Sequence, residues 1–325
     1  MTFGTQRGDL GADRDECKKV FDAFVNAGGN FFNSANRYMN GEAETILGEL
    51  IAGTGDRERC VIATKYTSPT NPDDPNATGN HRKNMVQAVK HSLERLGTDY
   101  LDLLLIHMWD PLTPIEELMR GLDDLVKSGK VIYIGVSDTP AFIVSRANTI
   151  AELRGWTPFI AYEIPYSLAE RTVEREMIPM ADYLGMTVTP WSPLGGGILT
   201  AKYNEEGGTG RLSDATPSSR NWMSDRNKAI AAEVARVAQE IGRTPAQVAL
   251  NWVRQQAGKK LKIPIIGART GEQAIDDLGC LDFELSKEHL DALSETSQIE
   301  LGFPGDWFTG DSIRGFTGGN YTVIP

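Results

Sequence analysis

Short apolar runs and helical repeats alternate along most of this chain. Runs of strand length stand at 30–33, 61–65, 101–107, 131–137, 159–163, 187–192 and 262–267. Around them, apolar residues recur at helical spacing, which predicts helices at about 13–27, 41–51, 81–96, 114–128, 140–154, 172–185, 225–241, 244–256 and 271–281. The alternation continues without a clear linker, so we predict a single α/β domain over 1–325, built on a parallel sheet.

The strand count favours a (β/α)8 barrel, the TIM barrel, over other parallel folds. Such a barrel needs about eight strands and typically about 250 residues. Seven runs are complete, and the fragment Met1-Thr2-Phe3 is expected to supply the eighth. No G-x-G-x-x-G follows an early strand, which argues against a Rossmann module. With 325 residues, 40% of them hydrophobic, the chain has enough apolar surface for a substantial core.

Charge and composition narrow the class of partner. The chain has 33 Lys and Arg against 44 Asp and Glu, a net charge of -11, which argues against nonspecific binding to nucleic acid or to an anionic membrane. No apolar run approaches the roughly 20 residues that cross a bilayer, and the start lacks the basic and apolar regions of a signal peptide. We therefore expect a cytoplasmic protein that acts on small molecules, and nothing in the sequence predicts its oligomeric state.

Cysteine and histidine usage predicts neither disulfides nor a metal site. The three cysteines form no C-x-x-C pair, and we expect them to be buried free thiols. The four histidines are scattered without the spacing of metal ligands.

Three polar residues stand where predicted strands end. Tyr38 follows the run at 30–33, Lys65 ends the run at 61–65 and His107 ends the run at 101–107. In a parallel barrel the carboxyl ends of all strands meet on one face, so these side chains are expected to converge. Taken singly, each has a plainer interpretation, because such a Lys is usually solvated and a lone His or Tyr is usually structural.

The sequence around Tyr38 resembles a motif of the aldo-keto reductase family. That family has Asn-Phe-(Ile)-Asp-Thr-Ala-x-x-Tyr where this chain has Asn30-Phe31-Phe32-Asn33-Ser34-Ala35-Asn36-Arg37-Tyr38. The resemblance implies that Tyr38 is the general acid of a carbonyl reduction, assisted by Lys65, while His107 orients the carbonyl. The residue types suit that task, because a tyrosine with a pKa near 10 is a poor acid at neutral pH unless a nearby ammonium favours its phenolate.

Asn33 departs from the family pattern, which has an Asp at this position paired with the Lys. An amide can hold Lys65 by hydrogen bonding but supplies no countercharge, so we expect the ammonium to be less favoured. Turnover is then expected to be weakened with cofactor binding largely kept, and Asn33→Asp is expected to raise it. Whether Asn33 is natural or was introduced is open.

The resemblance also implies an extended NADP(H) site in the second half of the chain. Trp191 would stack on the nicotinamide and Arg269 would grip the 2′-phosphate, which favours NADPH over NADH. Glu163 stands where Gln is usual, and a carboxylate can accept from the nicotinamide carboxamide but cannot donate to it. The residues expected to bind the cofactor are Ser137, Asp138, Glu163, Trp191, Ser192, Pro193, Leu194, Gly267, Ala268, Arg269, Gln273, Asp276 and Asp277.

Aromatic residues suggest where a carbonyl or alcohol substrate would bind. Tyr66, Trp109 and Trp307 are expected to line an apolar pocket, with the tail at 299–325 closing over it as it does in the family. The same aromatics would equally serve to pack the end of the barrel.

The start of the chain lies inside another family motif, Gly-Thr-Met-Thr-Phe-Gly. The N-terminal hairpin and most of the first strand are therefore expected to be absent from this sequence, either because Met1 is internal to a longer product or because the first strand is short. This feature and Asn33 support an alternative, a catalytically impaired NADP(H)-binding regulatory or channel-subunit-like protein of the same fold.

Overall fold

A curved parallel sheet forms the centre of the molecule. The computed structural model describes residues 1–6, 11–71, 73–203, 222–256, 262–309, 313 and 316. Its six strands are all parallel and lie in chain order. They are β1 (Phe31–Asn33), β2 (Val61–Tyr66), β3 (Leu101–Ile106), β4 (Val131–Ser137), β5 (Phe159–Pro165) and β6 (Thr187–Trp191).

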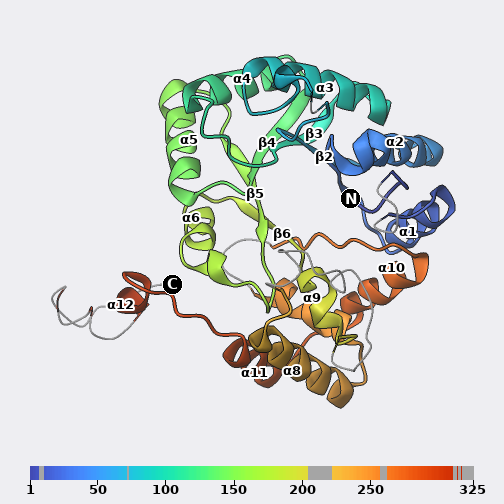
Figure 1. Cartoon of the computed structure of the whole chain (residues 1–325), viewed down its shortest axis with the longest axis vertical. Coiled ribbons are helices and arrows are strands. Elements are labelled where there is room, and N and C mark those ends of the chain that lie inside the picture. Colours follow the sequence, from blue (N-terminus) through green and yellow to red (C-terminus); the bar gives the residue numbers. More distant parts are fainter. Residues whose placement is uncertain are drawn as a thin grey trace.

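Helices connect successive strands and lie along the outer side of the curved sheet (Figure 1). The predicted α/β architecture is confirmed, and the sheet curls in the manner of a (β/α)8 barrel. The described helices are α1 (Arg14–Asn26), α2 (Glu42–Thr54), α3 (Arg82–Leu96), α4 (Ile115–Lys127), α5 (Ala141–Arg154), α6 (Met177–Tyr183), α8 (Asp225–Ile241), α9 (Pro245–Gln255), α10 (Gly271–Leu278), α11 (Lys287–Thr296) and α12 (Gly305–Thr309).

Local sequence signals explain where several helices begin. The side chain of Asp13 accepts a hydrogen bond from the backbone of Glu16 at the start of α1. Thr244 and Gln247 form a reciprocal capping box at the start of α9, beside Pro245 in the first turn. α11 was not predicted, although the Ser286 side chain accepts from the backbone N–H of His289 at its start, because its short apolar stripe is interrupted by many charged residues.

Two segments that were predicted as strands do not form strands of the sheet. The run at 262–267 forms only an isolated bridge, from Lys262 to Val188, although the backbone N–H groups of Ile263 and Ile265 donate to β6. The bond between them would run from the N–H of residue 190 to the Ile263 carbonyl, but residue 190 is Pro190 and has no N–H, so the ladder is interrupted. The expected eighth strand at Met1-Thr2-Phe3 was wrong, because Phe3 and Gly4 bridge to Ala12 instead of joining the six-stranded sheet.

The sheet separates two apolar clusters. On its inner face a small cluster contains Ala63, Leu103, Leu105 and Ala161, with Phe31 packed against it. A much larger cluster lies between the outer face and the helices. Gly135 on β4 belongs to the inner face, where an added Cβ would come within 3.0 Å of the Ala161 carbonyl oxygen. The narrow interior therefore requires a residue without a side chain there.

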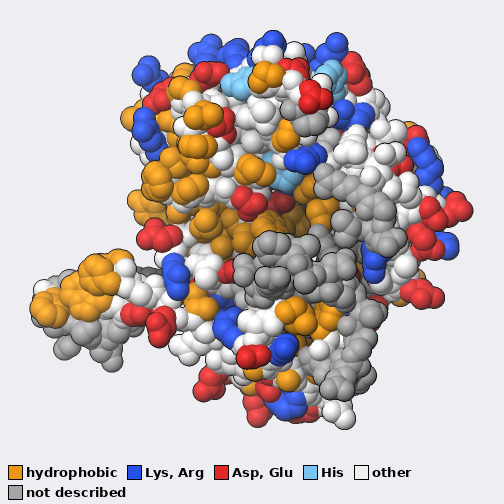
Figure 2. All heavy atoms as spheres, viewed as in Figure 1, with side chains coloured by type: hydrophobic (Ala, Val, Ile, Leu, Met, Phe, Trp, Pro, Cys, Tyr) orange, Lys and Arg blue, Asp and Glu red, His pale blue; other side chains and the backbone are white. Residues whose placement is uncertain are grey.

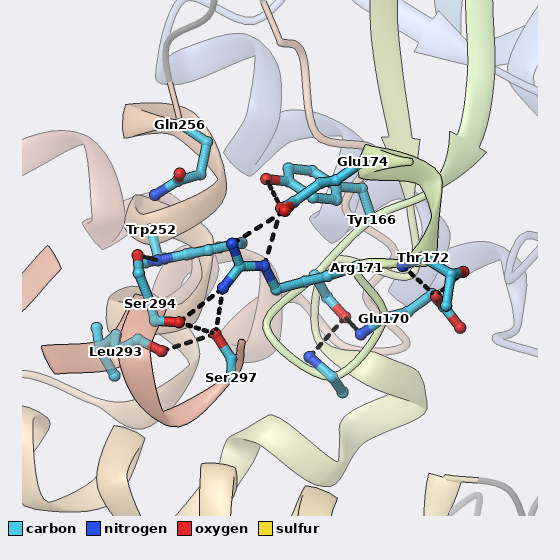
Figure 3. A network of polar contacts seen from close by, with 12 residues as sticks. Tyr166, Glu170, Arg171, Thr172, Glu174, Trp252, Gln256, Leu293, Ser294 and Ser297 are labelled. Atoms are coloured by element: carbon cyan, nitrogen blue, oxygen red, sulfur yellow. Dashed lines mark hydrogen bonds and ion pairs between the residues drawn. The ribbon is translucent and has the colours of Figure 1, made fainter. Parts of the chain in front are cut away.

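Arg171 ties the segment after β5 to the C-terminal helices (Figure 3). Its guanidinium donates to both carboxylate oxygens of Glu174, at 2.8 and 3.0 Å, and to the carbonyl of Ser294 at 2.7 Å. It also lies 5.3 Å from the ring centre of Trp252. This network fixes α9 and α11 against the loop that leaves the sheet, so Arg171 has a structural role in the described chain.

All three cysteines are buried and free, as predicted. Among the described helices, none is both long enough and apolar enough to span a membrane. On the face drawn in Figure 2, hydrophobic side chains gather over the region of β5, α5 and α6 and border a hollow near the middle. Exposed members of these elements include Phe142 and Leu153 on α5 and Tyr183 on α6.

Candidate active site

Tyr38 is positioned by an unusual turn between β1 and α2. It begins a 3-10 turn in which Met39, Asn40 and Gly41 all have positive φ, at 49°, 54° and 93°. Two successive residues other than glycine in this region are strained, and such strain persists only where surrounding contacts hold it. The Met39 side chain is 1% exposed and supplies that anchor. The turn leaves the Tyr38 ring partly exposed at the carboxyl end of the sheet.

Lys65 points into the barrel from β2 and is fully buried. Its Nζ donates to the carbonyl of Ser34 at 2.9 Å and to Oδ1 of Asn33, and it lies 3.5 Å from the Tyr38 hydroxyl. The carboxylate of Glu163 on β5 is also buried, and its Oε1 lies 3.1 Å from Nζ. The expected contact between Lys65 and Tyr38 is therefore present.

The expectation that the Lys65 ammonium is less favoured was wrong. Glu163 reaches across the inside of the curved sheet and forms an ion pair with it, while Asn33 Nδ2 donates to Oε2 of Glu163 at 2.8 Å. Burial by itself lowers the pKa of Lys65, but the charges and hydrogen bonds of Glu163 and Tyr38 more than offset burial, so that its pKa is raised. The ammonium is favoured, contrary to what Asn33 alone had suggested.

His107 lies beside Tyr38, as predicted. The two rings are nearly perpendicular, with centres 5.6 Å apart, and Nδ1 of His107 lies 3.5 Å from the Ser68 hydroxyl. Burial, with the nearby Lys65 and Arg37 cations, lowers the pKa of His107 to about 3. The imidazole is therefore neutral at pH 7 and can donate or accept a hydrogen bond but not act as an acid.

Asp138 and Trp191 connect the ends of β4 and β6. The indole N–H of Trp191 donates to Oδ1 of Asp138 at 3.0 Å and holds the partly exposed ring in place. Asp138 has a φ of 41°, a conformation that Asp adopts more readily than most residues. Although Asp138 is exposed, the protein around its carboxyl removes part of the surrounding water and raises its pKa to about 6, with Glu163 adding to the shift and the Trp191 hydrogen bond opposing it.

Other residues predicted to bind the cofactor also lie at the carboxyl ends of β4 and β6. Ser137 is buried at the end of β4, and Ser192 has a φ of 51° immediately after β6. Pro193 and Leu194 lead into a turn in which three successive glycines, 195–197, all have positive φ. Gly195 is buried, whereas Gly196 and Gly197 are partly exposed and carry no side chain that would shield their backbone.

The residues predicted to bind the other end of the cofactor, from Gly267 to Asp277, differ in exposure. Gly267 and Arg269 are exposed before α10, Ala268 between them is buried, and Gln273 Oε1 accepts a hydrogen bond from the backbone N–H of Arg269 at 2.9 Å. Asp276 contacts Thr244 and Gln247 at the start of α9, and Asp277 is 6% exposed. Asp276 therefore lies between α9 and α10, and Asp277 is buried next to it in the chain.

Only one of the three residues expected to line a substrate pocket lies near the site. Trp109 is partly exposed, and its backbone N–H reaches the carbonyl of Asp138. The expectation for Tyr66 was wrong: its ring is 1% exposed on the outer face of the sheet, where its hydroxyl donates to the carbonyl of Asn80. Residue parity explains this, since Lys65 faces inward and its neighbour must face outward.

The expected closure by the tail stays a prediction, and the described part of the tail does not lie over the sheet. α12 stands away from the sheet in Figure 1, and within the described residues the Trp307 ring contacts Phe303, Phe308 and Phe316 of the same tail. The rest of 299–325 lies largely outside the described residues.

Sequence reasoning missed two groups at the site. The Ser34 carbonyl holds Lys65, and the Ser68 hydroxyl lies beside His107. Ser34 immediately follows Asn33, and Ser68 stands three residues after Lys65, so proximity in sequence was the available signal.

Comparison with known proteins places this arrangement in a family. The family profile described as "Aldo/keto reductase family" matches residues 1–298. The chain belongs to the aldo/keto reductase family. It is therefore an oxidoreductase of the aldo-keto reductase type.

Individual members of the aldo/keto reductase family are similar in sequence to this protein over most of its length. It is 36% identical over 304 residues to "Aryl-alcohol dehydrogenase [NADP(+)]" of Phanerodontia chrysosporium, covering 90% of this chain and 78% of the relative. It is 36% identical over 307 residues to a probable aryl-alcohol dehydrogenase of Saccharomyces cerevisiae, covering 92% of each. A norsolorinic acid reductase of Aspergillus flavus is 34% identical over 313 residues, which is 94% of this chain and 78% of the relative.

Proposed function

We propose that this protein is an NADPH-dependent reductase that interconverts aldehydes or ketones and alcohols, with Tyr38 as the general acid. The observation that carries this proposal is the convergence of three groups from separate segments. The Tyr38 hydroxyl lies 3.5 Å from the Lys65 ammonium, and its ring lies against the His107 imidazole. A proton donor, a cation and a neutral hydrogen-bonding group are what carbonyl reduction needs at one place.

The residues at the carboxyl end of the sheet fit an NADP(H) cofactor. The Trp191 ring is partly exposed and held by Asp138, so it offers a fixed flat surface to a nicotinamide ring. The glycine turn at 195–197 allows close approach of a ligand to the backbone, and the exposed Arg269 supplies a cation suited to a 2′-phosphate. A relative that carries NADP(+) in its name supports the same assignment.

The protein's own groups would handle the proton. NADPH, when bound, supplies the hydride for the carbonyl carbon. Tyr38 donates its proton to the carbonyl oxygen, and the Lys65 ammonium stabilises the phenolate that remains. His107 is neutral at pH 7, so it orients the carbonyl oxygen by a hydrogen bond from a ring N–H and leaves proton donation to Tyr38.

The substrate class that we propose is an aryl aldehyde or ketone and the matching alcohol. The loop after β3 presents apolar surface next to His107, since Met108 is 43% exposed and Trp109 is partly exposed. Aromatic rings of a substrate would pack favourably on such side chains. Relatives named as aryl-alcohol dehydrogenases and norsolorinic acid reductases point in the same direction.

The structure weakens the alternative of a catalytically impaired regulatory protein. That alternative drew support from Asn33, which appeared to leave Lys65 without a countercharge. Glu163 supplies the missing carboxylate at 3.1 Å.

The experiment is to titrate the protein with NADPH and NADH by fluorescence and then to measure NADPH oxidation with a panel of aromatic aldehydes and ketones. We expect tighter binding of NADPH and turnover of at least one aryl aldehyde. Binding of NADPH without turnover of any carbonyl, or in reverse of any alcohol, would contradict the proposed activity and favour the regulatory alternative.

A further inference from the structure

We propose that Glu163 is the counter-ion of Lys65 and that Glu163 and Asn33 together are positioning residues that hold the lysine against Tyr38. This inference rests on the proposed function, because it assigns the two residues a part in the same proton transfer. Neither residue needs to touch the substrate for this role.

Two buried side chains, Lys65 and Glu163, and the partly buried Asn33 form a closed set of contacts. Lys65 contacts Asn33 through Oδ1 and Glu163 through Oε1, and Asn33 Nδ2 donates to the second oxygen of Glu163 at 2.8 Å. The side chain of Lys65 is 0% exposed and that of Glu163 is 4% exposed. Because solvent cannot replace a lost partner of Lys65 or Glu163 at this depth, each contact constrains the other two.

The position of each polar atom explains why residue 33 carries an amide. Its oxygen must accept from the Lys65 ammonium and its nitrogen must donate to the Glu163 carboxylate. A carboxylate at position 33 could accept from Lys65 but would lie against Glu163, where two acceptors of like charge repel. Asn33 is therefore matched to Glu163.

Charge balance leads to the same conclusion. The set contains one ammonium and one carboxylate, so it is neutral as a whole before Tyr38 releases its proton. Asn33→Asp adds a second carboxylate, which disfavours the phenolate beside it, and Glu163→Gln leaves a buried ammonium without a counter-ion. Making both changes moves the carboxylate from β5 to β1 and keeps the balance. The two departures from the family pattern, at positions 33 and 163, are in this account one compensated exchange.

The arrangement also changes the part expected of Glu163 toward a cofactor. Both of its carboxylate oxygens are directed at Lys65 and Asn33. Its first role is therefore to hold the lysine, rather than to accept from a nicotinamide carboxamide.

The test is a double-mutant cycle of wild type, Asn33→Asp, Glu163→Gln and the double variant. For each protein the melting temperature, NADPH binding by fluorescence, and kcat and KM with an aryl aldehyde are measured. We expect each single change to lower kcat by about tenfold or more with little change in NADPH binding. Glu163→Gln should also lower the melting temperature by about 5 °C or more.

The double variant is the decisive member of the cycle. We expect it to regain kcat to within about threefold of wild type and to recover most of the melting temperature. A matched control is Thr189→Val on β6, whose neighbour in the sheet register is Glu163 and whose buried hydroxyl has no hydrogen-bond partner among the described residues. It should leave kcat and melting temperature nearly unchanged.

The failures of the two proposals can be told apart. If wild type turns over no carbonyl, the proposed activity fails, and the melting temperatures still decide whether the pair is coupled. A Glu163→Gln variant as stable and active as wild type would overturn the inference, as would a double variant no better than Glu163→Gln. If Glu163→Gln does not fold, a folded double variant supports the inference and an unfolded one overturns it.

Discussion

Lys65 on β2 and Glu163 on β5 form a buried ion pair, with 3.1 Å between Nζ and Oε1. β2 and β5 are not neighbours in the sheet, since β3 and β4 lie between them. The pair therefore crosses the interior of the curved sheet, above an inner layer of small and aliphatic residues that includes Ala63 and Leu105. It is possible only because the sheet curls, and it brings the two charges to the end where Tyr38 lies.

Tyr38→Phe should abolish most of the activity and leave the fold intact. The hydroxyl is the proposed proton donor, and general acid catalysis is typically worth about 10²- to 10⁴-fold in rate. The phenol ring is partly exposed and its packing is kept in the variant. Steady-state kinetics with an aryl aldehyde should show a fall in kcat of this size, with NADPH affinity within about threefold of wild type. Full activity in the variant would assign the proton to another group.

Lys65→Met should destabilise the protein as well as inactivate it. The substitution removes the lysine charge and leaves Glu163, whose side chain is 4% exposed, without its counter-ion. Breaking a buried pair from one side costs about 3–5 kcal/mol of unfolding free energy. Chemical denaturation measures this loss. The control is Lys65→Met combined with Glu163→Gln, which removes both charges and should recover part of the stability; equal stability of the two variants would show that the pair is not coupled.

Asp138→Asn should change how stability depends on pH. The pKa of Asp138 is raised from an ordinary 3.8 to about 6, so the folded protein holds a proton that the unfolded chain releases between these values. The contribution of this group to stability therefore falls as pH rises from about 4 to about 6. Asparagine keeps an acceptor for the Trp191 indole but does not titrate.

Melting temperatures of wild type and Asp138→Asn across that pH range are the measurement. The melting temperature of Asp138→Asn relative to wild type should rise as pH rises from about 4 to about 6 and then level off. A difference that does not change with pH would mean that Asp138 has an ordinary pKa in the folded protein.

Arg171→Lys should weaken the attachment of the C-terminal helices without changing the chemistry. A lysine cannot make the paired contact with Glu174 and also reach Ser294 and Ser297. Loss of hydrogen bonds to a charged group at a site 12% exposed should cost about 2 kcal/mol or more. Arg236→Lys on α8 is the matched control, since Arg236 is 53% exposed and its ion pairs should be worth less than about 1 kcal/mol. Equal losses in the two variants would contradict a structural role for Arg171.

Much of the fold could be predicted because its signals are local. Helical spacing and caps located α3 and β3 within a residue or two, and strand ends placed Tyr38, Lys65 and His107 on one face. The run at 262–267 was predicted as a full strand because an apolar run does not reveal that its partner β6 contributes Pro190, which has no N–H to donate, at the pairing position. The Met1-Thr2-Phe3 fragment was misplaced because its partner, Ala12, could not be identified from periodicity.

The site was less predictable because its charged residues, Lys65 and Glu163, are far apart in the sequence. Asn33 and Glu163 were each recognised as departures from a family pattern, but only coordinates show that they contact one another. Tyr66 was assigned inward although its neighbour Lys65 already faced inward, so strand parity would have corrected that assignment. Trp307 could not be placed from sequence, because aromatic content alone does not tell which surface a tail contacts.

The central claim, that this protein moves hydride to a carbonyl while Tyr38 supplies the proton, is tested most directly by isotope transfer. NADPH carrying deuterium at the transferable position of its nicotinamide is incubated with an aryl aldehyde and wild type or Tyr38→Phe, and the alcohol is analysed by mass spectrometry. We predict one deuterium on the carbinol carbon with wild type and little alcohol with the variant. An alcohol without deuterium, or no alcohol from wild type with any carbonyl in the panel, would contradict it.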